Sequence, residues 1–195
     1  EIAYDTTAVR ENGDINATRL EAGLYGTIER GTWNAKVYNY NSERGIPGAI
    51  VNNVWRRGER VWDTNSFFQG SFVKEVNDQF KTQVNAKYAF YRTHYVNNDD
   101  KLIEVDNLYK QREVYVSTAN MYTIFPFWDV SMSYDFQWNE MKADMYGFVF
   151  PTRFTNLLSI ATALRLGKVK LQGSGLATFV NDRVKEGPAP KARQI

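Results

Sequence analysis

The stretch WDVSMSYDFQW, from Trp128 to Trp138, alternates without a break between large apolar residues and small or polar ones. Successive side chains of a β-strand point to opposite faces of the sheet, so this stretch predicts a strand with one apolar and one wet face. At about 3.3 Å per residue the strand is about 33 Å long, and a tilt near 45° gives about 23 Å of height. That height is close to the apolar band of a transmembrane β-barrel, about 25 Å tall.

Seven further stretches read as strands, and they are expected over residues 18–29, 33–40, 66–76, 80–91, 113–124, 154–166 and 169–179. Short turns near residues 31, 77, 126 and 168 join the strands in pairs, and Gly31 is expected to supply any positive φ that its turn requires. Long connections are expected over 42–65, 97–110 and 140–152. The pattern therefore predicts an all-β fold, a portion of an up-and-down antiparallel transmembrane β-barrel with eight strands, short turns at one end and long loops at the other.

Composition narrows the classes of function. The 195 residues contain no Cys and one His, which makes a zinc enzyme improbable, and the net charge of +2 gives little reason to expect nucleic acid as a partner. The mean hydropathy of −0.50 and the lack of a long apolar run exclude a transmembrane helix. No nucleophile motif or phosphate-binding loop is present, so the chain is not expected to be an enzyme.

The alternation also fits a soluble lipocalin-like barrel with its apolar face inside, because either barrel has one apolar face. Three features favour the membrane barrel over the soluble one. The long loops gather at one end, aromatic residues lie at strand ends, and charged or amide side chains occupy the other face in mid-strand. The residues on that second face are Lys36, Lys81, Gln83, Asn85, Lys87, Asp129, Asp135 and Arg165. Membrane lipid is thus an expected partner, and a passive porin is a third possibility.

Two long connections are candidates for ligand binding. Residues 51–63 contain two tryptophans and three arginines that suit an anionic or aromatic ligand, namely Trp55, Arg56, Arg57, Arg60 and Trp62. Residues 141–150 place Met145, Tyr146 and Phe148 at an exposed end, where an apolar ligand or a surface partner protein is able to dock. The alternative for both connections is a solvated loop whose large side chains pack among themselves.

A metal site has weaker support. Asp99, Asp100 and Asp106 offer oxygen ligands suited to calcium, but their spacing matches no EF-hand loop, and a solvated polar loop is the simpler interpretation. No cofactor other than calcium is expected. The lone His94 lies beside aromatic residues at a strand end, where a structural role is favoured.

Several segments resemble TonB-dependent outer-membrane receptors, especially the cobalamin-receptor-like members of gut-type Bacteroidetes. The similar segments are YNYNSERGIPGAI (38–50), RVWDTNSFFQGSF (60–72), residues 74–90 and DRVKEGPAP (182–190). The resemblance implies a bacterial outer-membrane location and transport of a scarce, bulky nutrient such as a corrinoid. It also implies two protein partners for the complete receptor, TonB and a surface-exposed binding lipoprotein. A full receptor of this type has 22 strands and a plug, so residues 1–195 are expected to be part of a single barrel domain without its plug and remaining strands.

Overall fold

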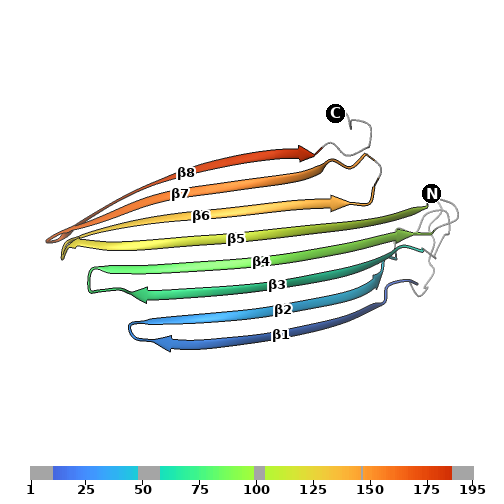
Figure 1. Cartoon of the computed structure of the whole chain (residues 1–195), viewed down its shortest axis with the longest axis horizontal. Helices are drawn as coiled ribbons and strands as arrows, with labels where there is room; N and C mark the ends of the chain where they lie inside the picture. Colours follow the sequence, from blue (N-terminus) through green and yellow to red (C-terminus); the bar gives the residue numbers. More distant parts are fainter. Residues whose placement is uncertain (1–10, 48–57, 99–103, 146, 186–195) are drawn as a thin grey trace, which may run out of the picture.

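Eight antiparallel strands form one up-and-down sheet in the order of the sequence (Figure 1). The computed structural model describes residues 11–47, 58–98, 104–145 and 147–185. The strands are β1 (Ile15–Ile28), β2 (Gly31–Gly45), β3 (Arg60–Glu75), β4 (Phe80–Asn97), β5 (Val105–Phe125), β6 (Trp128–Ala143), β7 (Phe150–Leu166) and β8 (Val169–Lys185). The predicted all-β meander of eight strands is therefore confirmed.

The four short turns fall where the sequence predicts them and lie together at one end of the sheet (Figure 1). The strands extend further than predicted at the opposite end, where residues 46–59, 98–104 and 144–149 connect them. The long connections are therefore shorter than predicted. Beyond the apolar stretches most side chains on both faces are polar, so the hydrophobic alternation fades. The strands nevertheless remain paired through their backbones, as Ile15 is with Arg44 and Asn97 is with Val105.

The first turn differs from its prediction in one detail. Arg30, and not Gly31, adopts the positive φ, at 55°. Gly31 begins β2, and a Cβ on it would lie 2.5 Å from the carbonyl oxygen of Val73. The glycine is therefore required by the close approach of β3, while the left-handed residue is an arginine.

Strand register divides the side chains into two faces. The apolar face consists of the even-numbered residues of β1 and β3–β7 and the odd-numbered residues of β2 and β8, and the polar face consists of the others. The apolar alternation of Trp128–Trp138 thus continues across all eight strands, for example through Leu24, Phe68 and Val116.

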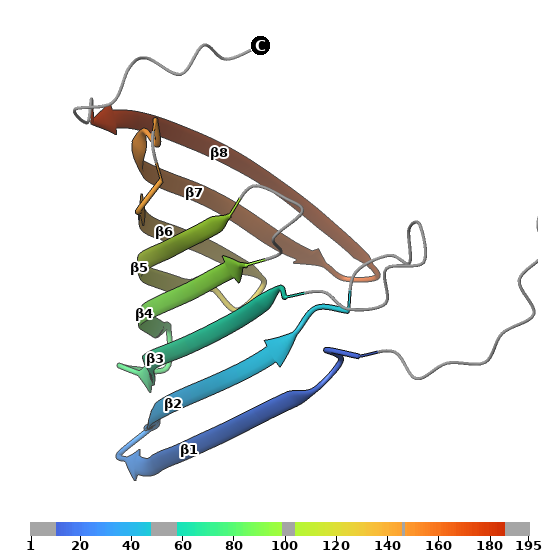
Figure 2. The ribbon, with the colours of Figure 1, turned by 90° about the vertical axis from the view of Figure 1, so that its right-hand side faces the viewer.

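Burial follows these faces. Among the described residues six side chains are buried, and all six lie on the polar face: Ser42, Val61, Ala89, Asn97, Ser117 and Ala143. On the apolar face, Phe68 is 53% exposed and Ile160 is 55% exposed. Side chains converge on the inside of a curved sheet and diverge on its outside. The sheet is curved and strongly twisted (Figure 2), and the burial indicates that its polar face is the inner one.

The sheet does not close into a barrel. β1 and β8 are its two edges, and over the described residues each is paired on one side alone. The expected barrel portion is therefore present as an open sheet. In the described ranges, no helix has the length and apolarity to cross a membrane.

Candidate functional site

The outer, apolar face carries large exposed apolar side chains on all eight strands. Its large side chains are 65% exposed at Leu20, 51% exposed at Met132 and 54% exposed at Leu171. Exposed apolar side chains on the polar face belong mainly to the edge strands, as at Tyr25 and Leu176. A contiguous apolar surface of this kind marks an interface with lipid or with another apolar partner.

The centre of the inner, polar face holds a charged and aromatic cluster. Lys87 Nζ lies 3.0 Å from Glu113 Oε1 and 3.2 Å from the hydroxyl oxygen of Tyr91. The same ammonium group lies 5.7 Å from the ring centroid of Phe67 and 5.9 Å from that of Tyr91. Such contacts favour the charged form of a lysine that is partly removed from water.

An aromatic stack extends this cluster towards β1. The rings of Tyr38 and Phe67 are stacked with 4.7 Å between centroids, and the guanidinium of Arg19 lies 5.3 Å from the Tyr38 centroid. Ala89 lies directly opposite Phe67 on the neighbouring strand and is 0% exposed, so the neighbouring side chains cover it completely. We call the set Arg19, Tyr38, Phe67, Lys87, Tyr91 and Glu113 the inner cluster.

Most charges elsewhere on the polar face are paired, over the described residues. Lys36 Nζ lies 2.6 Å from Glu21 Oε1, and Arg153 donates two hydrogen bonds of 2.7 Å to Asp182. Arg165 donates a short hydrogen bond to Asp129. The inner surface is thus polar and nearly balanced in charge, with aromatic rings at its centre.

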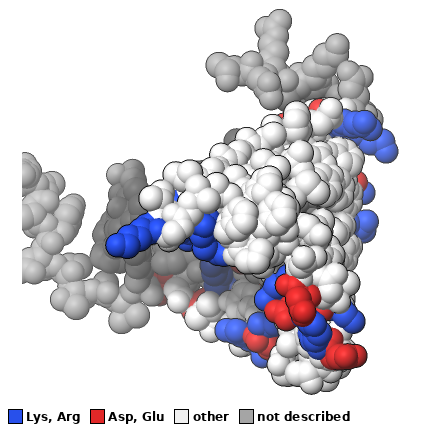
Figure 3. Space-filling view, turned by 90° about the vertical axis from the view of Figure 1, so that its left-hand side faces the viewer, with Lys and Arg blue, Asp and Glu red and all other residues white. Residues whose placement is uncertain are grey.

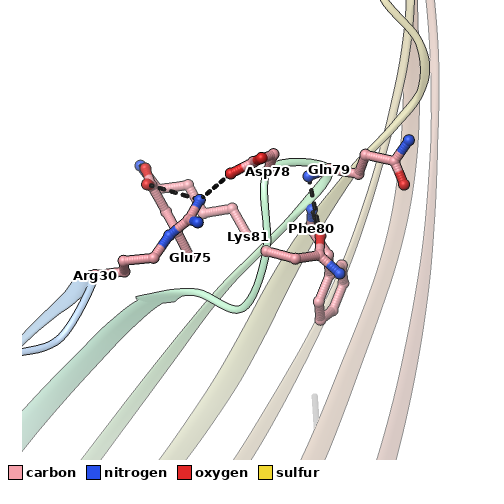
Figure 4. Close-up of polar contacts among 7 residues, drawn as sticks. Arg30, Glu75, Asp78, Gln79, Phe80 and Lys81 are labelled. Atoms are coloured by element: carbon pink, nitrogen blue, oxygen red, sulfur yellow. Dashed lines mark hydrogen bonds and ion pairs between the residues drawn. The ribbon is translucent and has the colours of Figure 1, made fainter.

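The turn end carries a second polar cluster that holds the hairpins together. Arg30 Nη2 lies 2.7 Å from Asp78 Oδ1 and 4.0 Å from Glu75 Oε2, and Lys81 Nζ lies 3.4 Å from Glu75 Oε1 (Figure 4). Asn77 Oδ1 accepts hydrogen bonds from two backbone amides of the β3–β4 turn. Seen from the turn end, acidic and basic side chains lie mixed in the lower part of the view, further basic side chains lie at its left and right margins, and uncharged residues make up much of the remaining surface (Figure 3). This cluster joins the β1–β2 and β3–β4 turns and is structural.

Arg60, a predicted ligand-binding residue, is occupied by internal contacts. Its guanidinium lies 2.8 Å from both Asp14 Oδ2 and Glu43 Oε1, and Asn12 Nδ2 donates to the carbonyl oxygens of Ile46 and Glu59. The hydrogen bond from Arg60 is the main cause that lowers the pKa of Asp14 below its ordinary value of 3.8. These contacts fasten residues 12–14 to the loop ends of β2 and β3.

Trp62 and Asp106 both contact His94. The rings of Trp62 and His94 are 5.3 Å apart, and His94 Nε2 lies 2.6 Å from Asp106 Oδ1. Trp62 and His94 also line a shallow groove at the loop end, together with Thr18, Asn41, Glu43 and Arg92. No group of three or more metal-ligating side chains occurs among the described residues, and the calcium candidates Asp99 and Asp100 lie outside them.

The second predicted loop is described in part. Met145 is 43% exposed, and the Phe148 ring packs edge-on against Phe150 at 5.8 Å. These residues follow β6, whereas Trp62 belongs to β3, so two strands separate the two predicted sites. Trp55, Arg56, Arg57 and Tyr146 lie outside the described residues.

Comparisons with known proteins leave the family open. No protein-family model matches the chain, and no curated protein matches it. The likeness to TonB-dependent receptors therefore depends on the segments quoted above.

The inner cluster is the feature that sequence reasoning missed. Lys87 was expected on the wet face, but its partners Glu113 and Phe67 lie on neighbouring strands, 26 and 20 positions away. The turn near 77 sets the register of β3 and β4 and places Phe67 within two positions of Lys87, but residues 98–104 join β4 to β5, so no short turn indicates that Glu113 lies beside Lys87.

Proposed function

We propose that this chain is part of the barrel wall of a TonB-dependent outer-membrane transporter, which imports a scarce, bulky nutrient of the corrinoid class. The observation that carries the proposal is the burial pattern: the six buried side chains lie on the polar face, and the apolar face is exposed. The segments that resemble cobalamin-type receptors supply the nutrient class.

The polar face is the inner one and the apolar face the outer one, which favours a membrane barrel over a lipocalin-like barrel. A soluble ligand-binding barrel encloses its apolar face, whereas a membrane barrel turns that face to lipid and keeps a polar interior. Here Phe68 is 53% exposed and its neighbour Ala89, on the opposite face of the next strand, is 0% exposed. The sheet therefore has the arrangement suited to lipid.

The unpaired edges of β1 and β8 favour a barrel with more than eight strands. In lipid an unpaired strand edge is costly because no water satisfies its backbone groups. β1 and β8 would each need a further strand as a neighbour, and an inner surface with two stacked rings and a lysine at its centre suits a wider lumen than eight strands enclose.

In this proposal the inner cluster faces the transport path. Tyr38 and Phe67 offer stacked rings to a large planar ligand, and Lys87 offers a charge beside them. The residues predicted to capture ligand at the surface remain predictions, namely Trp55, Arg56, Arg57, Arg60, Trp62, Met145, Tyr146 and Phe148. TonB would energise release, and a surface lipoprotein would assist capture.

Uptake of labelled cyanocobalamin by cells that carry the natural full-length protein tests the function. We expect uptake to require the protein and to stop when a protonophore removes the proton gradient, because TonB draws on that gradient. Uptake that persists without the gradient would indicate a passive porin instead. A chain that stays monomeric and folded in plain buffer would contradict the membrane assignment.

The inner cluster can be tested with two neighbouring phenylalanines. Phe67→Ala removes a stacked ring on the polar face, while Phe68→Ala removes a ring of the same size on the apolar face. We expect Phe67→Ala to weaken cyanocobalamin binding by about tenfold and Phe68→Ala to leave it unchanged. Equal effects of both variants would remove the inner cluster from the transport path.

A further inference from the structure

The outer face changes character just beyond its apolar band, at the end opposite the short turns. Phe90, Val114 and Trp138 close the band on β4, β5 and β6. Directly beyond them the same face carries exposed cations, among them Arg92, Lys110, Arg112, Lys142 and Arg183. We call these five residues the outer cationic rim.

Three of these cations stand in one row. Register places Arg92 opposite Lys110, and Lys110 opposite Lys142. Directly opposed side chains on one face have Cβ atoms about 5 Å apart, and like charges at that distance repel each other. A row of three cations destabilises the sheet unless an anion neutralises it.

Internal carboxylates supply little of that neutralisation. Within the described residues Lys142 alone of the row has an ion pair, at 3.3 Å to Glu140. Most arginines and lysines on the polar face of the described sheet have close carboxylate partners, as Lys36 has Glu21 and Arg153 has Asp182. The outer cationic rim is therefore a place where positive charge is left for an external partner.

The surroundings of the row indicate the chemistry of that partner. The rim is continuous with the apolar band, and Arg183 lies 5.5 Å from the ring centroid of Phe154 at the edge of the band. An acidic protein or a nucleic acid would match the charges but not the exposed apolar surface beneath them. A lipid with a phosphate headgroup matches both, because its acyl chains cover the band while its phosphate lies among the cations.

We infer that the outer cationic rim binds the phosphate headgroup of an anionic lipid in the membrane leaflet at the loop end. This inference rests on the proposed membrane location of the sheet, and it adds a specific lipid site on the outer surface of the barrel wall. Arg92, Lys110 and Lys142 form the centre of the site, and Arg112 lies one row closer to the band.

Lipid binding to the natural full-length protein, purified from membranes in detergent, tests the site. Phosphatidic acid, phosphatidylcholine, inorganic phosphate and polyglutamate would be titrated into the parent protein and into the triple variant Arg92→Gln, Lys110→Gln, Lys142→Gln. The control is Lys74→Gln, Lys168→Gln, Lys170→Gln, which removes three cations near the turn end. We expect the row variant to bind phosphatidic acid at least about tenfold more weakly and the control to bind as the parent does.

The other outcomes each contradict the inference. Unchanged binding by the row variant, or an equal loss in the control, would show that the row is not the site. Inorganic phosphate that saturates the row as tightly as the lipid would identify a free-phosphate site, and equal binding of polyglutamate would identify an acidic protein as the partner.

A second measurement separates this site from the membrane proposal itself. Tryptophan fluorescence of the reconstituted protein should be quenched by brominated phosphatidylcholine, because Trp33 and Trp138 lie on the apolar face. Quenching without phosphatidic acid selectivity would overturn the lipid site alone, whereas the absence of quenching would overturn the membrane location and the site with it.

Discussion

On the apolar face Phe68 and Ile160 leave half or more of their surface uncovered, whereas on the polar face Ala89 and Ser117 are 0% and 6% exposed. In a soluble domain the large apolar side chains are the buried ones. The contrast teaches that the inner face of this sheet is packed with small and polar residues, and that the described strands leave the large apolar side chains uncovered.

A charge placed on each face gives the largest expected difference. Val116→Arg introduces a cation near the middle of the apolar face, between Ala86 and Phe136, and in lipid this should cost about 2–4 kcal/mol of unfolding free energy. Gln83→Arg places the same side chain on the polar face of β4, where a cost below about 0.5 kcal/mol is expected. Urea unfolding of both variants in phosphatidylcholine vesicles measures the difference, and equal costs would mean that the apolar face does not contact lipid.

Two alanines of β4 give a smaller contrast. Ala89→Leu inserts a large side chain where the inner cluster leaves no exposed surface, and overpacking there should cost about 1–3 kcal/mol. Ala86→Leu lies on the exposed apolar face of the same strand and should change stability by less than about 0.5 kcal/mol. The same unfolding experiment compares them, and a destabilising Ala86→Leu beside a neutral Ala89→Leu would reverse the assignment of inside and outside.

The alternation of hydrophobic residues was sufficient to predict the strands and their order. It located all four short turns, because Gly167, Pro126, Asn77 and Arg30 interrupt the alternation within a few residues of the observed hairpins. It made the strands too short at the loop end, since β5 begins at Val105 and its first eight residues are mostly polar, without apolar residues at every second position. Backbone pairing sustains a strand there without any amphipathic signal.

The direction of curvature and the inner cluster were beyond reach of the sequence. Alternation states that one face is apolar, but the face that turns inward depends on how side chains of eight strands pack together. The contact between Lys87 and Glu113 joins residues on β4 and β5 that are offset by two positions in register, because Ala89 is the residue opposite Glu113. Such diagonal contacts depend on rotamers, which the pattern of residue types does not determine.

The smallest expected effect tests whether the loop end contributes to stability apart from either face. The hydrogen bond from Arg60 lowers the pKa of Asp14 in the folded state below its ordinary value of 3.8. A carboxylate with a depressed folded pKa stabilises the fold above its unfolded pKa, and this contribution disappears as the pH falls through the folded value. Asp14 is 61% exposed and Arg60 is 29% exposed, so solvent and salt screen the pair and the effect should be small. Unfolding midpoints of the parent and Asp14→Asn should therefore differ at neutral pH and converge in acid below the folded pKa.

A difference that persists in acid would mean that Asp14 acts through packing. Arg30→Gln at the turn end serves as the matched control for loss of an exposed ion pair.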